Sequence, residues 1–322
     1  MSEAPAPPPL FPWPIRWGLP LAACSLACGL SEGLMRLADG NAFPQVDIFE
    51  AREGQLRLEA NAEARVRRPD GGIYTLRTGA RGLRSPTGSD VLIVGDSQVL
   101  GYGVEDDEPF PALLRVFNAG VPGHGIADAV QHAAELIPAL RPSVVLLVVN
   151  QANDWDEGMK PALERYVVRN GWLGSASQAN ATGVRFWSSP LSRVHLLAYP
   201  ALVIFKRAPQ PPGLPDPALA TTFRSAFDAL AHENPGVRFI AAYLPVDAAT
   251  SSVRAAASPL ALPGEPWADT TIHDATLAAF AGTEIIDLLP ILSEPDNFQV
   301  GDYHLSVKGH AAVAGVVRER LR

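Results

Sequence analysis

The chain has 322 residues, of which 47% are hydrophobic and 19% are charged, so a large core is expected and global disorder is not. Its formal net charge of −8 and the absence of long Lys and Arg clusters argue against a nucleic-acid-binding surface. The two cysteines, Cys24 and Cys28, lie in one N-terminal apolar stretch, which excludes a thiolate metal site or a disulfide framework in the rest of the chain.

The N-terminus predicts a membrane anchor. Residues 1–14 are rich in Pro and Ala and are predicted to be disordered. Residues 15–38 form an apolar stretch that reaches the ~20 residues needed to cross a bilayer only if Glu32 is included near one end. Arg16, preceded by a tail with little charge, favours a cytoplasmic N-terminus. We therefore expect a signal anchor whose body lies outside the cytoplasm, in the periplasm or at the cell surface.

Two other interpretations of this stretch stay open. Residues 21–24 resemble a bacterial lipobox, which would leave a lipidated Cys24 at the mature N-terminus. Alternatively, the chain is soluble and its first helix packs on its own core.

Residues 40–87 predict a small β appendage. The stretches 55–60, 64–67 and 72–77 alternate between apolar and polar residues, which predicts strands. Asp70-Gly71-Gly72 separates the last two stretches and predicts a hairpin of exposed strands.

Residues 88–322 predict a catalytic domain in which short apolar strands alternate with helices. Strands are expected at 91–94, 115–118, 144–149, 238–244 and 284–288, and helices at 126–140, 219–233, 273–280 and 307–321. This alternation indicates an α/β fold with a parallel sheet covered on both faces. Residues 155–218, rich in large aromatic side chains and then in proline, interrupt it. They are interpreted either as an insertion that covers the strand ends and shapes a substrate site, or as a loosely structured excursion.

The candidate nucleophile is Ser97. Residues 91–94 are consecutive apolar residues, and the strand they predict stops at Gly95-Asp96. A serine just past the carboxyl end of a central parallel strand lies where open α/β sheets place their ligands, beside the N–H groups of the next helix. A simple helix N-cap is the competing interpretation.

Three later stretches contain the groups that a serine nucleophile needs. Gly120 can offer a backbone N–H to an oxyanion, and the side chain of Asn153, preferred over Asn150, can offer a second donor. His304 is the candidate base, and Asp302 the group that orients its imidazole.

These stretches together resemble the SGNH hydrolase superfamily, also called GDSL-type esterases. The resemblance covers residues 88–322 and is carried by Gly95-Asp96-Ser97, Asn118-Ala119-Gly120, Asn153-Asp154, and Asp302 with His304. It implies a flavodoxin-like three-layer α/β/α sandwich. It also implies an oxyanion hole made by the Ser97 N–H, the Gly120 N–H and the Asn153 side chain, with Asp96 and Asp154 in supporting roles.

The anchor, the β segment and the motif at residues 81–84 resemble the exported, membrane-tethered bacterial branch of this superfamily. Two departures are visible. Gln151 replaces the glycine usual two residues before the asparagine, and Asp302 and His304 are separated by one residue instead of two. The shorter spacing leaves open whether Asp302 or a backbone carbonyl orients His304.

The sequence thus predicts a serine esterase that works through an acyl-enzyme without metal or organic cofactor. Its expected substrate is a small-molecule or glycan ester, and its expected partner is the membrane. One alternative is an O-acyltransferase that passes the acyl group to a sugar hydroxyl. The other is an inactive envelope or carbohydrate-binding protein that kept the fold.

Overall fold

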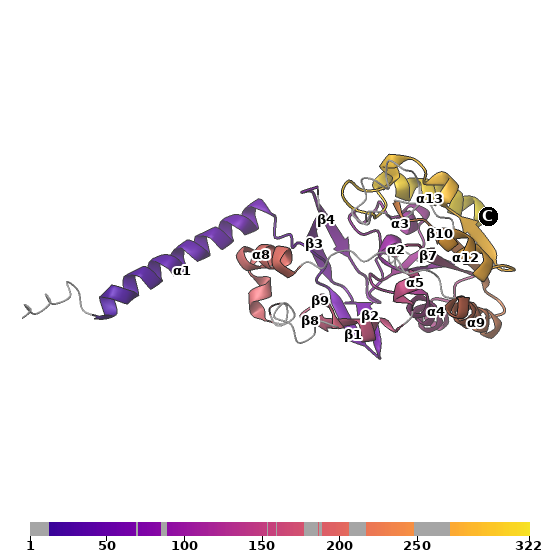
Figure 1. Ribbon diagram of the computed structural model, residues 1–322, viewed down its shortest axis with the longest axis horizontal. Coiled ribbons are helices and arrows are strands. Elements are labelled where there is room, and N and C mark those ends of the chain that lie inside the picture. Colours follow the sequence, from indigo (N-terminus) through magenta and orange to yellow (C-terminus); the bar gives the residue numbers. More distant parts are fainter. Residues whose placement is uncertain are drawn as a thin grey trace, which may run out of the picture.

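A long N-terminal helix projects from an α/β body in the computed structural model (Figure 1). The structure describes residues 13–68, 70–84, 89–152, 154–158, 160–176, 186, 189–205, 217–247 and 271–322. Helix α1 (Trp13–Ala38) contains a stretch, Trp17–Ala38, that is long and apolar enough to cross a membrane. The residues of this stretch are exposed or, toward its C-terminal end, half-buried. The structure therefore does not show the alternative of a first helix packed on its own core.

The body is built on a five-stranded parallel sheet. Its strands are β5 (Val91–Gly95), β6 (Phe117–Gly120), β7 (Val144–Asn150), β10 (Arg238–Leu244) and β11 (Glu284–Asp287). They lie in the order β11-β10-β7-β5-β6, with parallel pairing throughout. Counted along the chain, this is the 2-1-3-4-5 order of flavodoxin-like folds. The predicted fold class is confirmed.

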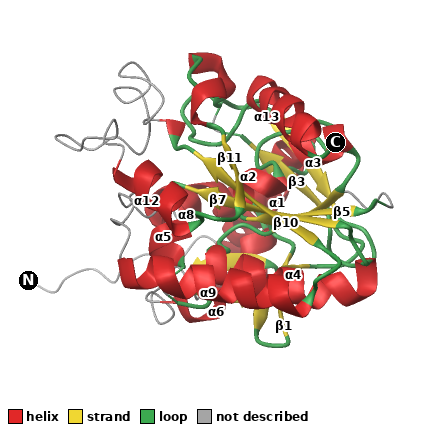
Figure 2. Ribbon diagram, turned by 90° about the vertical axis from the view of Figure 1, so that its right-hand side faces the viewer, coloured by secondary structure: helices red, strands yellow, loops and turns green. Residues whose placement is uncertain are grey.

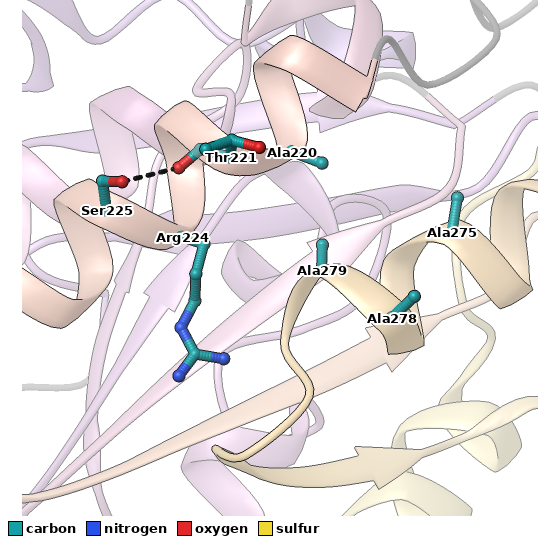
Figure 3. Close-up of a pocket in the computed structure, with 7 residues that line it drawn as sticks. All are labelled: Ala220, Thr221, Arg224, Ser225, Ala275, Ala278 and Ala279. Atoms are coloured by element: carbon teal, nitrogen blue, oxygen red, sulfur yellow. Dashed lines mark hydrogen bonds between the residues drawn. The ribbon is translucent and has the colours of Figure 1, made fainter.

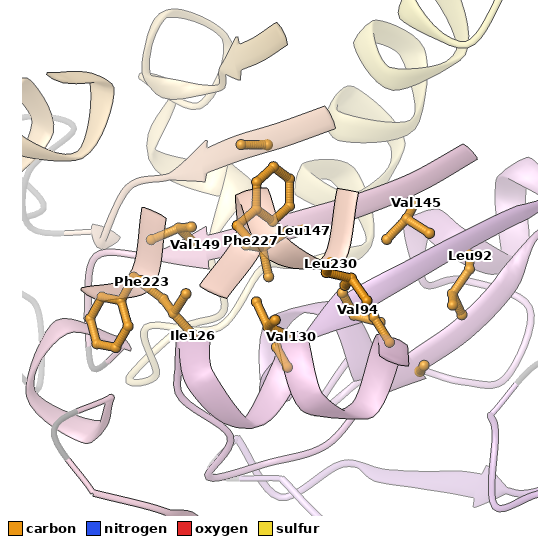
Figure 4. Packing of buried hydrophobic residues seen from close by; sticks show 14 of the residues in the cluster. Leu92, Val94, Ile126, Val130, Val145, Leu147, Val149, Phe223, Phe227 and Leu230 are labelled. Atoms are coloured by element: carbon orange, nitrogen blue, oxygen red, sulfur yellow. The ribbon is translucent and has the colours of Figure 1, made fainter. Parts of the chain in front are cut away.

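Helices cover both faces of this sheet (Figure 2). On one face, α4 (Ile126–Leu140), α9 (Pro217–Glu233) and α12 (Thr271–Ala279) pack on strand residues that include Leu92 and Val94 (Figure 4). On the other face, α3 (Phe110–Leu114) and α13 (Val307–Arg320) pack on the alternate residues of the same strands. Because every residue of β5 and β7 is buried, both strands appear in the sequence as uninterrupted apolar runs.

Two antiparallel ribbons precede the sheet: β1 (Phe49–Arg52) with β2 (Gln55–Leu58), and β3 (Glu63–Arg67) with β4 (Ile73–Arg77). The second ribbon is the predicted hairpin. The expectation that its strands are exposed is wrong for one face, since the side chains that alternate inward join a third apolar cluster. These inward side chains are Ala64, Val66, Tyr74 and Leu76.

The described part of the predicted insertion packs beside these ribbons. It contains α5 (Asp154–Glu157), α6 (Ala162–Arg165), β8 (Tyr166–Arg169), β9 (Trp172–Ser175) and α8 (His195–Phe205). The N–H of Phe49 donates to the carbonyl of Gly171 at 2.9 Å, joining β1 to the β8–β9 turn. Trp187 and residues 206–216 lie outside the described residues. That the insertion shapes a substrate site stays a prediction.

One predicted strand was misplaced by two residues. The strand expected at 115–118 is β6, which begins at Phe117. Arg115 instead ends α3 in a left-handed conformation with φ of 58°, and its N–H donates to the carbonyls of Ala112 and Pro111. The short helix α3 was not predicted, and the helix expected to begin beside Ser97, α2 (Ser97–Leu100), was given no bounds, because stretches of four or five residues carry no helical periodicity.

Candidate active site

Ser97 begins α2 directly after the carboxyl end of β5. Asp96 caps this helix, since its Oδ1 accepts a hydrogen bond from the N–H of Gln98 at 2.9 Å. Gly95 is required for this tight turn, because a Cβ there would lie 2.6 Å from Val99 Cγ2 and 3.1 Å from the carbonyl oxygen of Val148. Ser97 therefore lies at the carboxyl edge of the sheet, next to the central strand.

His304 and Asp302 lie beside Ser97 in the loop that precedes α13. The distance from His304 Nε2 to Ser97 Oγ is 2.9 Å, and that from His304 Nδ1 to Asp302 Oδ1 is 2.6 Å. Asp302 Oδ1 also accepts a hydrogen bond from the backbone N–H of His304 at 3.1 Å. The carboxylate, and not a backbone carbonyl, is thus the group bonded to the imidazole. All three predicted side chains come together despite the short Asp-x-His spacing.

The charges around His304 favour its protonated form. Burial lowers the pKa of His304, but the carboxylates of Asp302, Asp96 and Asp247 outweigh it and raise that pKa above its usual value. Burial raises the pKa of Asp302, yet the charge and hydrogen bonds of His304 outweigh it and leave that pKa below the usual value. These shifts favour the imidazolium–carboxylate pair that forms when His304 accepts a proton.

Gln98 holds the loop that carries His304. Its Nε2 donates to the carbonyl of Tyr303 at 3.1 Å, and its Oε1 accepts from the N–H of Leu305 at 3.0 Å. Gln98 is 1% exposed. The residue after the serine thus binds both neighbours of the histidine, which fixes the imidazole against Ser97. The sequence contained no signal for this contact.

Two tyrosine rings stack against the imidazole of His304. The ring of Tyr102 is nearly parallel to that of His304 with centroids 4.8 Å apart, and the ring of Tyr303 lies at 4.5 Å. Rings stacked on an imidazole restrict its rotation and attract its protonated form. Both contacts restrain His304 in the orientation that reaches Ser97.

Asn150 and Asp154 support the turn around Ser97. Asn150 Nδ2 donates to Asp96 Oδ2 at 2.8 Å, and the backbone N–H of Asn150 donates to Asp154 Oδ2 at 2.7 Å. Burial raises the pKa of Asp96, although the hydrogen bonds from Asn150 and Gln98 oppose the shift. Both carboxylates thus bind groups around the Ser97 turn, and their supporting roles stay a prediction. Asn153, the predicted oxyanion donor, lies outside the described residues.

Gly120 lies against α2, the helix that begins at Ser97. A Cβ at this position would lie 2.2 Å from the backbone nitrogen of Leu100 and 2.8 Å from the carbonyl oxygen of Asp96, so only glycine fits. Its N–H donates to Asn118 Oδ1 at 3.0 Å. An oxyanion could use this N–H only by sharing it with Asn118 or displacing that bond. The oxyanion role of Gly120 therefore stays a prediction, whereas its steric role is clear.

Gln151, the first departure from the superfamily pattern, has a structural explanation. Its Oε1 accepts hydrogen bonds from the Tyr243 hydroxyl at 2.7 Å and from the Val246 N–H at 3.1 Å. The side chain thereby ties the end of β7 to the end of β10. A glycine could not make these bonds.

Arg84, from the motif at residues 81–84, fixes the segment after α2. Its buried guanidinium donates to the carbonyls of Leu100, Gly101 and Val104 at 3.0, 2.5 and 2.6 Å, and its Nε donates to Asp106. A planar guanidinium can bind several carbonyls at once, which an ammonium cannot do in the same geometry. Arg84 therefore supports the end of α2 and the segment that follows it.

A surface hollow of about 460 Å³ lies between α9 and α12 (Figure 3). Alanines line it together with Thr221, Arg224 and Ser225, and none of the predicted site residues does. Among the residues that the structure describes, no group of three His, Cys, Asp or Glu side chains is placed to hold a metal.

The chain is similar in structure to several solved proteins. TesA has 13% sequence identity over 72% of this chain and 97% of its own, with a TM-score of 0.41. The psychrotrophic esterase EstA from Pseudoalteromonas sp. has 13% identity over 71% and 94%, with a TM-score of 0.39. An acetylxylan esterase from Geobacillus stearothermophilus has 13% identity over 72% and 94%, with a TM-score of 0.40.

No protein-family model and no curated protein matches the chain. Since the three structural matches combine 13% identity with TM-scores of 0.41 or less, we infer the function from the site itself.

Proposed function

We propose that the chain is a membrane-tethered serine esterase with Ser97 as nucleophile, His304 as base and Asp302 as the group that orients His304. The hydrogen-bonded series from Ser97 Oγ through the imidazole to the Asp302 carboxylate is the observation that carries the proposal. A serine alone is a poor nucleophile, and a base at 2.9 Å that is oriented by a carboxylate is what activates it.

In the first half-reaction, Ser97 Oγ forms a bond to the carbonyl carbon of the ester while its proton passes to His304 Nε2. Asp302 stabilises the resulting imidazolium. The carbonyl oxygen becomes negative and is stabilised by backbone N–H donors, among them that of Ser97, which as the first helical residue has no partner within α2. When the tetrahedral intermediate collapses, the bond to the leaving alkoxide breaks and His304 returns the proton to it.

In the second half-reaction, His304 takes a proton from water, whose oxygen attacks the acyl-enzyme carbonyl. Collapse breaks the bond to Ser97 Oγ, which recovers its proton from the imidazolium and releases the acid. The remaining oxyanion donors of the proposal are the Gly120 N–H and the Asn153 side chain. The substrate is an ester of a small molecule or an O-acyl group on a glycan.

Helix α1 supplies the tether of the proposal. Its apolar stretch Trp17–Ala38 has 22 residues and the length to cross a bilayer. Its large side chains Trp17, Leu21, Leu26 and Leu30 are each at least 60% exposed, as expected for side chains that contact lipid. With Arg16 on the cytoplasmic side, the body lies in the periplasm or at the cell surface.

The test is hydrolysis of a short-chain aryl ester by the full chain in detergent. We expect turnover by the wild type and losses of at least about 10³-fold in Ser97→Ala and His304→Ala. Ser293→Ala and His232→Ala alter an exposed serine and an exposed histidine and should leave turnover unchanged. A folded wild type without turnover on a panel of esters contradicts the proposal. Appearance of the acyl group on an added polyol instead of as free acid identifies transfer in place of hydrolysis.

A further inference from the structure

The proposed membrane span contains a charged residue near its C-terminal end. Glu32 lies six residues before Ala38, or about 9 Å along the axis at 1.5 Å per residue. A carboxylate at that depth is costly in lipid unless it is paired.

The structure shows what pairs with Glu32. One of its carboxylate oxygens accepts from the backbone N–H of His195 at 3.0 Å, and the other accepts from that of Leu196 at 2.9 Å. The Nε of Arg36 donates to the same carboxylate at 2.7 Å, and Nη2 of Arg36 donates to the carbonyl of Arg193 at 2.6 Å. Glu32 and Arg36 therefore join the last turns of α1 to the beginning of α8, which lies beside them in Figure 1.

A second attachment holds α8 in place. The Tyr199 hydroxyl donates to the carbonyl of Ala42 at 3.1 Å and accepts from Arg67 Nε at 3.1 Å. Ala198 and Ala201 are 0% and 5% exposed and form the side of α8 that faces the protein. Because α8 is fixed at both places, its position relative to α1 is set by the fold.

Most of the residues of α8 are apolar. Residues 195–205 contain no Asp, Glu, Lys or Arg, and the sequence continues with Lys206 and Arg207. Leu197 is 39% exposed, and Leu191, just before the helix, is 53% exposed. A helix without charged side chains is expected to be buried in protein or in lipid, and basic residues that follow such a helix can reach the lipid headgroups.

From this arrangement we infer that α8 is a second membrane-contacting element, embedded in the surface of the bilayer that α1 crosses. The inference rests on the proposed tether. Since α8 begins level with Glu32, insertion of α1 to Ala38 brings α8 to the boundary between headgroups and acyl chains. The partner is the lipid bilayer itself. Contact at two points, unlike a single helix, fixes the orientation of the body on the membrane and thereby the direction in which the site around Ser97 faces.

The test uses the full chain in vesicles of phosphatidylcholine and phosphatidylglycerol, with Cys24→Ala and Cys28→Ala as background. Single spin labels are placed through Leu26→Cys on α1, Leu197→Cys on α8 and Leu113→Cys on α3. Leu113 is the matched control, because it is a leucine of 37% exposure on a helix of the sandwich. Each labelled variant is first shown to melt at the temperature of the unlabelled chain. The measurement compares the accessibility of each label to oxygen, which concentrates in lipid, and to a water-soluble nickel chelate.

We expect oxygen accessibility to exceed nickel accessibility at positions 26 and 197, and the reverse at position 113. A label at 197 that behaves as the one at 113, while the label at 26 is in lipid, overturns the inference and leaves the tether intact. A label at 26 that is accessible to nickel refutes the tether and the inference with it. Neither outcome bears on the esterase chemistry, so the failures are distinguishable.

Discussion

Replacement of Gln98 by leucine tests whether the residue after the nucleophile positions the base. Leucine preserves most of the side-chain volume and removes both hydrogen bonds, that to the carbonyl of Tyr303 and that from the N–H of Leu305. These two bonds are made by a side chain that is 1% exposed, so water cannot replace them without entering the core.

The size of the effect follows from those bonds. Loss of a buried neutral hydrogen bond costs about 1–2 kcal/mol, so Gln98→Leu should lower the free energy of unfolding by about 2–4 kcal/mol. A shift of about 1 Å in the imidazole costs about 10²-fold in rate. Because the bonds hold His304 and not the substrate, we expect kcat to fall by about that factor while KM changes little.

The assay is steady-state ester hydrolysis together with denaturant unfolding. Thr276→Val is the matched control, since Thr276 Oγ1 accepts from Trp155 Nε1 at 2.8 Å and donates to the carbonyl of Ile272 at 2.7 Å, again inside the core. This control should lose stability of the same order and keep its kcat. If Gln98→Leu loses stability but keeps the kcat of the control, Gln98 is only structural and the reasoning is refuted.

Three further predictions concern the surroundings of the site. Because Asp302 raises the pKa of His304, wild-type kcat/KM should rise with pH through a midpoint above 6.5. In Asp302→Asn this midpoint should move down and kcat should fall by roughly 10³-fold or more, and an unchanged midpoint in the pH–rate profile contradicts the prediction. Arg84→Lys should lower the free energy of unfolding by about 3 kcal/mol in a urea titration, since lysine cannot bind all the carbonyls that the guanidinium reaches. A loss below about 1 kcal/mol would show that the guanidinium is not needed for stability. Gly120→Ala should lower the melting temperature and abolish turnover, because the added Cβ would lie 2.2 Å from a backbone nitrogen. The control Gly315→Ala, with open space around it, should raise the melting temperature, and a fully active Gly120→Ala refutes the steric argument.

Much of the sandwich could be predicted because its central strands are buried on both faces and α4 is amphipathic. The uninterrupted apolar runs of β5 and β7 and the periodicity of α4 are local signals, and all three elements lie where the sequence placed them. The start of β6 was missed because Arg115, predicted to begin the strand, instead ends α3 with a positive φ, which an arginine does not indicate in a sequence. Strand β2 lies within the predicted stretch 55–60, but its pairing with β1 was missed because β1 has only four residues, too few to show an alternation.

The candidate site shows the same division. Ser97, Asp302 and His304 could be named because the serine directly follows a predicted buried strand and an acid lies two residues before a histidine. Gln98 could not, since a glutamine shows nothing of its partners until the fold brings residues 303 and 305 beside it. The hydrogen bond between the Gly120 N–H and Asn118 was equally invisible, because it depends on side-chain rotation at the end of β6.

The central claim is that Ser97 is an activated nucleophile, and the most direct measurement is the site of covalent labelling by a fluorophosphonate. After reaction of the full chain, trypsin releases the peptide of residues 85–115, which also carries Ser85 and Ser89 as internal comparisons. Tandem mass spectrometry should find one adduct, on Ser97, and the same peptide from His304→Ala should remain unmodified. An unmodified Ser97 in the folded wild type, or equal labelling when His304 is absent, would contradict the account.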